Sequence, residues 1–471
     1  MAKPARASMW FVICSFIQKG VTFFTTPFFT RMLSTDAYGT VVIYNSWYEI
    51  ITILATFQLA TGVFNKAMIK FEDDRDGYTS STLVLASVLT GSVFGIYIWF
   101  ADLWNGLFDL PTCMMIMLFL DIFFSTAMSL WSIRNRFEYR YKSVILLTLT
   151  VNILGPLLSI LLIILSQEQN QAYAKIGGVL AVKILVYLGV YLKILQRGKT
   201  YVNTRYWKYA LIYNIPLIPH YLSQQVLSQS DRIMINKLCG SSDAGIYGVA
   251  YQLSMALFIF TLSIHNSFTP WTFESIRDRN YRAIGRLALK IEIGVGLACF
   301  AFSLFAPELI YILGGKEYSA AVWIVPPVTM SILFQTIYTF FGNIEFYFEK
   351  TKFVMVASLL VAVLNVGLNA VFIPLFGFVA AGYTTLFCYA VYSFVHYWFM
   401  VHICRQNHIP SIYDGTSMWI CGIVCIILSF LSYILYLNTA VRYVVILTIS
   451  IAVWSFCHKH KAKLLAFIKS K

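Results

Sequence analysis

Charged side chains stand inside long apolar runs of this chain, where a charge has the largest energetic effect. Lys19, Glu49 and Lys183 are the clearest cases. A charge at the centre of a bilayer costs about 2.5–3.5 kcal/mol on insertion scales, so such a residue faces protein or water rather than lipid. Two kinds of chemistry fit these residues. The lysines could attract an anionic group, or the charges could neutralise each other in internal pairs such as Lys19–Glu49.

The charged residues belong to polar stripes with helical spacing. Positions i, i+4, i+7 and i+11 share one face of a helix. The three stripes are Ser15, Lys19, Thr22 and Thr26; Asn45, Glu49, Thr52 and Thr56; and His220, Gln224, Ser228 and Asp231. They predict a water-filled, partly cationic cavity. Its candidate lining is Lys19, Glu49, Lys183, Arg31, Arg232 and Gln224. For Arg31 and Arg232 the alternative is a position at the membrane interface with no further role.

Four carboxylates in or beside apolar runs are candidates for binding a proton or another ion. They are Asp121, Glu292, Glu345 and Asp231. Glu345 lies close to the end of its run, so a solvated position is its alternative. His265 and His396 favour packed or hydrogen-bonded positions. No metal site and no cofactor is predicted.

The elements that must position these residues are transmembrane helices. The chain is 59% hydrophobic and 12% charged, whereas soluble domains carry about 25% charged residues. A span needs about 20 mostly apolar residues. This length predicts an all-α polytopic membrane protein of about fourteen helices, near 8–30, 37–65, 80–104, 111–133, 143–166, 174–195, 209–228, 244–267, 286–306, 320–345, 353–374, 379–403, 417–436 and 442–457. The longest connection is expected near 268–285.

The distribution of Lys and Arg predicts the orientation. With both ends of the chain in the cytoplasm, twenty-five of these residues fall on that side and five on the other. Cytoplasmic loops of membrane proteins carry such an excess. The net charge of +14 is therefore read as a topology signal rather than as a nucleic-acid surface.

Two stretches repeat at nearly one offset. Asp36-Ala37 and Asp243-Ala244 each follow a predicted helix, and each is followed by a glycine and, eight residues after the Asp, by a tyrosine. In a second repeat, the sequence around Phe137-Glu138 resembles the sequence around Phe348-Glu349. An offset of six helices keeps both copies in the same orientation, as in the parallel repeats of transporters. The predicted parts are an N-lobe at 1–195, a linker at 196–208, a C-lobe at 209–403, two further helices at 404–457 and a basic cytoplasmic tail at 458–471.

Three loose motifs in this order resemble a known family. They are Phe29-Thr30-Arg31-Met32-Leu33-Ser34 with Tyr38-Gly39; Asp231-Arg232 with Gly245, Tyr247 and Tyr251; and Asn365, Asn369, Ile373-Pro374, Gly377 and Ala380-Ala381-Gly382. The chain resembles polysaccharide and O-antigen flippases of the Wzx type, in the multidrug/oligosaccharidyl-lipid/polysaccharide (MOP) exporter superfamily. The resemblance implies a transporter that moves undecaprenyl-pyrophosphate-linked oligosaccharides across a bacterial inner membrane by alternating access. Membrane lipids would surround it, and a polysaccharide polymerase and chain-length machinery are the implied partners.

Two other function classes remain open at this stage. A drug or cation antiporter of the same superfamily would favour an acidic cavity, whereas the stripes mix Lys19 with Glu49. A membrane-embedded sugar polymerase would need a sizeable exterior loop, and the predicted outer connections are short. The sequence holds no GxxxxGK[ST] phosphate loop and no HExxH motif. A transporter, not an enzyme, is therefore the favoured reading.

Overall fold

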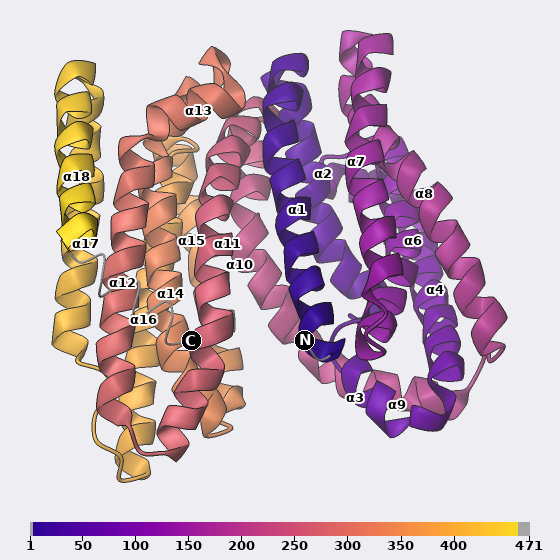
Figure 1. The fold of residues 1–471 in the computed structure, drawn as a ribbon. Helices are drawn as coiled ribbons and strands as arrows, with labels where there is room; N and C mark the ends of the chain where they lie inside the picture. The colour runs from indigo at the N-terminus through magenta and orange to yellow at the C-terminus, as the bar shows by residue number, and fades with distance from the viewer. Residues whose placement is uncertain (1–2, 460–471) are drawn as a thin grey trace. The chain divides into compact units, whose positions relative to one another are not determined.

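The computed structural model describes residues 3–459. For residues 3–9, 11–13, 15, 16, 19, 351, 449 and 452–459 it describes the backbone alone. The expected basic tail lies outside the described residues from 460 onward. All regular structure in the described part is helical (Figure 1). The α-helices are α1 (Lys3–Met32), α2 (Thr35–Thr56), α3 (Phe64–Lys70), α4 (Arg75–Trp99), α5 (Ala101–Phe108), α6 (Thr112–Phe137), α7 (Tyr141–Leu165), α8 (Gln171–Gly198), α9 (Thr204–Asn214), α10 (Ile218–Cys239), α11 (Ser241–Arg277), α12 (Tyr281–Leu304), α13 (Ala306–Gly314), α14 (Val325–Tyr347), α15 (Thr351–Phe376), α16 (Ala380–Gln406), α17 (Gly415–Tyr436) and α18 (Thr439–Lys459).

Each of the fourteen expected spans falls on a long helix or on a bent helix pair, so the predicted all-α polytopic fold is confirmed. Within residues 3–459, nine helices are long and apolar enough to cross a membrane, and a tenth span is formed if the 3₁₀ segment Lys316–Trp323 is joined to α14 across a 49° bend. Helices α2 and α10 have 22 residues each and are long enough to cross, yet they are not among these apolar spans. Each carries one of the polar stripes, which lowers its mean hydropathy. Helix α1 has 30 residues, and the structure describes only the backbone over much of its first half.

Several expected boundaries are wrong, and one of them is the end expected at residue 228, because α10 continues to Cys239. The long connection near 268–285 does not exist, because α11 continues to Arg277 and α12 begins at Tyr281. An apolar run marks where a membrane span ends, but a helix can continue into water with charged residues on it. Helix α2 ends at Thr56, nine residues before the expected limit, because Phe57 and Gln58 adopt left-handed backbone angles with φ of 49° and 53°.

The helices group into two compact units. The first contains residues 1–252, 312–318 and 351–384, and the second contains 253–311, 319–350 and 385–471. In the first unit α7 packs on α8, α6 on α8, and α10 on both α2 and α15. In the second unit α12 packs on α14 and α17. The predicted lobe boundaries remain a prediction.

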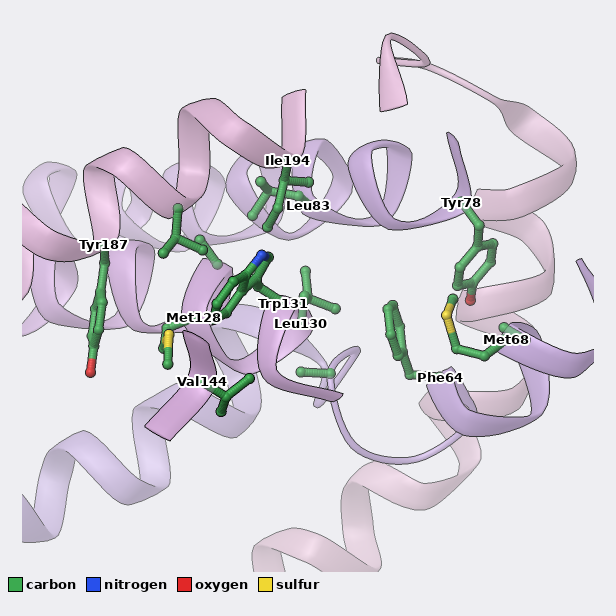
Figure 2. Close-up of a cluster of buried hydrophobic side chains, with 14 of the residues drawn as sticks. Phe64, Met68, Tyr78, Leu83, Met128, Leu130, Trp131, Val144, Tyr187 and Ile194 are labelled. Carbon is green, nitrogen blue, oxygen red and sulfur yellow. The ribbon is translucent and has the colours of Figure 1, made fainter. Parts of the chain in front are cut away.

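A large apolar core fills the first unit between α3, α4, α6, α7 and α8. Figure 2 shows Trp131 and Leu130 of α6 between the side chains of neighbouring helices, with Phe64 and Met68 of α3 facing Tyr78 of α4. Phe64, Met68 and Leu130 have no exposed surface. Inside a membrane, close van der Waals packing of such side chains, rather than their removal from water, holds the helices together. This core holds α6 and α8 side by side, and both helices carry charged side chains into the interior, among them Asp121 of α6 and Lys183 of α8.

Helix α14 is the centre of the second unit. Most of its side chains are buried, on every face of the helix, because α12 and α17 pack against it. Pro326 and Pro327 stand in its first turn, where the missing N–H groups cost no helical hydrogen bond. The helix therefore begins cleanly after the bend and carries Glu345 to a buried position near its other end.

Candidate functional site

A buried polar network surrounds Asp231 in the first unit. Tyr247 Oη of α11 donates to Asp231 Oδ2 at 2.7 Å, and Asn369 Nδ2 of α15 donates to Asp231 Oδ1 at 2.7 Å. Gly240, with a φ of 105°, forms the one-residue turn from α10 to α11 that brings Tyr247 back toward Asp231. We call the Asp231 network the set Ser230, Asp231, Tyr247, Asn365, Asn369 and Thr384.

The rest of the Asp231 network is equally well satisfied. Ser230 Oγ donates to Asn365 Oδ1 at 2.8 Å, Asn369 Nδ2 lies 3.2 Å from the same oxygen, and Thr384 Oγ1 donates to Asn369 Oδ1. Asp231 is 1% exposed and both asparagines have no exposed surface. A buried, fully bonded network of this kind fixes one arrangement of the helices that share it. Here the helices are α10, α11, α15 and α16.

Arg232, the next residue, faces an aromatic ring. Its guanidinium carbon lies 4.0 Å from the centroid of Tyr251, and its Nη1 donates to Gln229 Oε1. Among the described residues, Arg232 forms no ion pair with a carboxylate. Gln252, adjacent to Tyr251, donates to Thr26 Oγ1 at 2.7 Å and so joins α11 to the polar stripe of α1. A cation held over an aromatic face, with no carboxylate to neutralise it, is suited to an anionic ligand.

Lys183 and Asp121 form an ion pair in the interior of the first unit. Lys183 Nζ lies 2.8 and 2.7 Å from the two oxygens of Asp121, and Ser125 Oγ donates to Asp121 Oδ1 at 2.7 Å. The same ammonium lies 5.4 Å from the ring centroid of Tyr48. The Asp121 side chain is 8% exposed and that of Lys183 is 22% exposed. Two residues proposed for separate roles, anion binding and ion coupling, are therefore partners.

Removing one member of this pair should cost more stability than removing both. Asp121→Ala leaves a partly buried ammonium without its partner, and we expect a loss of about 3 kcal/mol, the lower end of the range for buried pairs because Lys183 keeps some exposure. Adding Lys183→Met should recover part of that loss. Thermal unfolding of the three variants in detergent measures the coupling. The surface pair Arg277–Asp278, 71% and 60% exposed, is the control and should show a coupling below about 1 kcal/mol.

The other predicted cavity residues occupy different surroundings. Glu49 and Gln224 are exposed on α2 and α10. Arg31 donates to the carbonyl oxygens of Pro27 at 2.8 Å and of Ile312 at 2.9 Å, so it binds the ends of two helices. Lys19 lies on α1, and its side chain is outside the part of the chain that the structure describes. Membership of a common cavity stays a prediction for these four residues.

The second unit contains two of the predicted carboxylates. His396 Nδ1 lies 2.8 Å from Glu345 Oε1, and neither side chain has exposed surface. The alternative of a solvated Glu345 is wrong, and the expected hydrogen-bonded position of His396 is confirmed. Glu292 of α12 is fully buried beside the thiol of Cys421 on α17. Within the described residues, no three His, Cys, Asp or Glu side chains are grouped so that they could hold a metal ion.

Sequence reasoning missed several polar residues of the interior. Asn365, Asn369 and Tyr247 were noted only as part of a family resemblance, although an i, i+4 pair of asparagines in an apolar run is itself a signal of buried hydrogen bonding. Lys175 of α8 was not considered. Lys175 stands near the start of α8, and its ammonium lies 4.5 Å from the ring centroid of Phe29 on α1.

Comparison with known proteins identifies the family. The family described as polysaccharide biosynthesis protein matches residues 5–276, more than half of the chain. The chain belongs to this family. A second family, MatE, matches residues 216–371. A relative from Haemophilus influenzae, described as Lsg locus putative protein 1, is 22% identical over 384 residues, which are 77% of this chain and 90% of that protein.

Solved structures with the same fold are transporters. Lipid II flippase MurJ in an inward closed conformation aligns with a TM-score of 0.67 at 14% identity, over 93% of this chain and all of that one. A multidrug resistance MATE family transporter of the MOP superfamily, in an inward-facing conformation, aligns with a TM-score of 0.63 at 13% identity, over 84% of this chain and 96% of that one. Together with the apolar helices of residues 3–459, the shared fold supports a multi-pass, all-α membrane protein of this polysaccharide biosynthesis family, as the sequence predicted.

Proposed function

We propose that this polysaccharide biosynthesis family member moves undecaprenyl-pyrophosphate-linked oligosaccharides from the inner to the outer leaflet of a bacterial inner membrane, with both chain ends in the cytoplasm. The observation that carries the proposal is the pair Arg232 and Tyr251. A guanidinium binds phosphate oxygens through several N–H groups, and an aromatic ring stacks on a sugar. A lipid-linked sugar phosphate offers both groups at one end, while its chain stays in the bilayer.

The Asp231 network is a better coupling site than Asp121 or Glu345. Asp121 is neutralised by Lys183, and Glu345 is bound to His396. The hydrogen bonds of Asp231 instead join α10 to α11 and α15. Binding of a proton or a metal cation at this carboxylate would change contacts among three helices at once. That is the kind of local change that can shift a transporter between two conformations.

Reconstitution tests the proposal directly. The wild-type protein in liposomes is expected to move a fluorescent lipid-linked oligosaccharide across the bilayer, measured as the fraction accessible to an added quencher. Arg232→Ala should lower the rate about 10–100-fold, since a hydrogen bond to a charged group contributes about 1.5–3 kcal/mol. Lys237→Ala, an exposed cation on the same helix, is the matched control and should leave the rate unchanged. No movement by the wild type would end the proposal. Lys19→Ala separately tests the stripe of α1.

Transport of a drug or another organic cation is the second candidate. The MatE match and the structural likeness to MATE transporters favour it, and so does the buried acid Asp231. The same liposomes, loaded with a fluorescent organic cation and given a sodium or proton gradient, separate the two. Cation efflux without oligosaccharide movement would favour the antiporter. If the protein instead moves lipid-linked oligosaccharides, the polymerase and chain-length machinery of polysaccharide synthesis are its expected partners.

A further inference from the structure

The starts of α2 and α11 touch at two glycines. A Cβ added at Gly39 would lie 1.7 Å from the carbonyl oxygen of Ser241, and one added at Gly245 would lie 2.5 Å from the carbonyl oxygen of Thr35. Contacts this short leave no room for any side chain. Gly39 and Gly245 stand in the two copies of the sequence repeat, after Asp36-Ala37 and Asp243-Ala244. Two segments that echo each other in sequence therefore meet in space.

Hydrogen bonds surround the glycine contact. Ser242 Oγ donates to Thr35 Oγ1 at 2.7 Å, and Ser241 Oγ donates to Asp36 Oδ1. Beside them, Asn236 Nδ2 at the end of α10 donates to Asp109 Oδ2. We call this set of contacts the latch, with the residues Thr35, Asp36, Gly39, Ser241, Ser242 and Gly245.

The latch borders an open cavity of about 810 Å³ within the first unit, lined by both polar and apolar residues. Asp36 and Ser241 of the latch line it, together with Asp109, Glu168 and Asn236. A hydrogen bond between exposed polar groups contributes only about 0.5–1.5 kcal/mol, because water replaces the partner when the bond breaks. Most of the latch is thus built from contacts that can open at low cost, unlike the apolar core around Trp131.

We propose that the latch is the outer gate of the transporter: it is closed in this conformation, and it must open in every cycle to let the polar headgroup leave. The proposal rests on the proposed function and on the predicted orientation, which places the starts of α2 and α11 on the outer side. The two repeat copies close this end by direct backbone contact. No ligand or bulky side chain is needed to hold it shut.

A reversible cross-link tests the gate. In a background with Cys113→Ser and Cys239→Ser, which removes two accessible native thiols, Thr35→Cys and Ser242→Cys are introduced together. The 2.7 Å contact brings these side chains close to the Cβ separation of about 3.5–4.5 Å that a disulfide needs. After oxidation with copper phenanthroline in liposomes, oligosaccharide movement should fall to the level of protein-free vesicles. Dithiothreitol should restore it.

Asn105→Cys with Thr112→Cys is the matched control. These side chains are also 2.8 Å apart and exposed, but they join α5 to the adjoining α6 and do not connect the two repeat copies. The oxidised control should transport normally, and the single-cysteine variants should be insensitive to oxidant. A pair that cross-links fully and still transports would overturn the proposal, as would a pair that never cross-links.

The cross-link yield does not depend on the substrate, so the two hypotheses fail separately. If the wild type moves an organic cation and no oligosaccharide, the proposed function fails. The latch is then judged by whether oxidation of the Thr35→Cys/Ser242→Cys protein stops cation movement.

Discussion

Asp231→Asn is expected to abolish transport while the protein stays folded. The substitution keeps the shape of the side chain and removes its charge, so a coupling ion loses its only acidic ligand in the Asp231 network. The measurement is the rate of oligosaccharide movement with sodium or proton gradients imposed in turn, together with the unfolding temperature. Asp102→Asn, an exposed carboxylate on α5, is the control and should change neither.

Asp231→Ala tests whether the Asp231 carboxylate also stabilises the fold, apart from any role in ion coupling. This change leaves the buried hydroxyl of Tyr247 without its acceptor and one N–H of the buried Asn369 amide without its acceptor, while that amide keeps its contact with Asn365. An unsatisfied buried group costs about 1–3 kcal/mol, so we expect a loss of about 2–6 kcal/mol and a visibly lower unfolding temperature. If Asp231→Asn transports at the wild-type rate under both gradients, the carboxylate has a structural role alone, and the coupling site must be sought elsewhere.

Helix positions could be predicted from the sequence because lipid imposes a length and a composition on each span. The same rule explains why the polar stripes were informative. The polar residues of α1, α2 and α10 repeat at helical spacing, i, i+4, i+7 in α1 and α2 and i, i+4, i+8 in α10, and so predict one polar face on each helix. Where water rather than lipid surrounds the helix, the rule no longer applies. The extension of α11 to Arg277 was missed for this reason.

Partners of the charged residues could not be predicted, because they depend on how distant helices pack. Lys183 and Asp121 are 62 residues apart in the chain, and the sequence suggested an internal pair only for Lys19, with Glu49. Only the apolar core that holds α6 beside α8 decides which carboxylate a lysine on α8 meets. Likewise, Asp231 and Asn369 are 138 residues apart, and their hydrogen bond exists because α10 packs on α15.

The family motifs acquire a physical explanation in the structure. Asp231, Tyr247 and Asn369 come from motifs that are separate in sequence, yet they form one network with almost no exposed surface. Gly39 and Gly245 come from the first two of those motifs and lie in a close backbone contact between the starts of α2 and α11. The motifs therefore specify two connected features of the first unit: a buried polar centre and, at the starts of α2 and α11, a latch. Tyr247 lies two residues from Gly245, so the two features are only half a turn of α11 apart.

Gly39→Ala is the second change with a large expected effect. Its new Cβ would overlap the carbonyl of Ser241, which belongs to the backbone and cannot rotate away. The contact must widen by more than an ångström, so the latch cannot close. We expect transport to be lost and the Thr35→Cys/Ser242→Cys cross-link to form far more slowly in this variant. An impermeant thiol reagent should in turn label Ser242→Cys faster, because the latch no longer shields it.

Gly95→Ala on α4 is the matched control, since a Cβ there meets nothing within 4 Å. Alanine favours a helix over glycine by about 1 kcal/mol, so this variant should be slightly more stable and should transport normally. The same helix preference acts at Gly39, where it opposes the steric effect. Gly39→Ala is therefore compared with Gly95→Ala in two measurements, transport and unfolding temperature. If Gly39→Ala loses transport but unfolds at nearly the same temperature as Gly95→Ala, the defect lies in the closing of the latch and not in folding. Normal transport and normal cross-linking by Gly39→Ala would show that α2 and α11 can separate at this point without consequence, and the latch would then be a static contact.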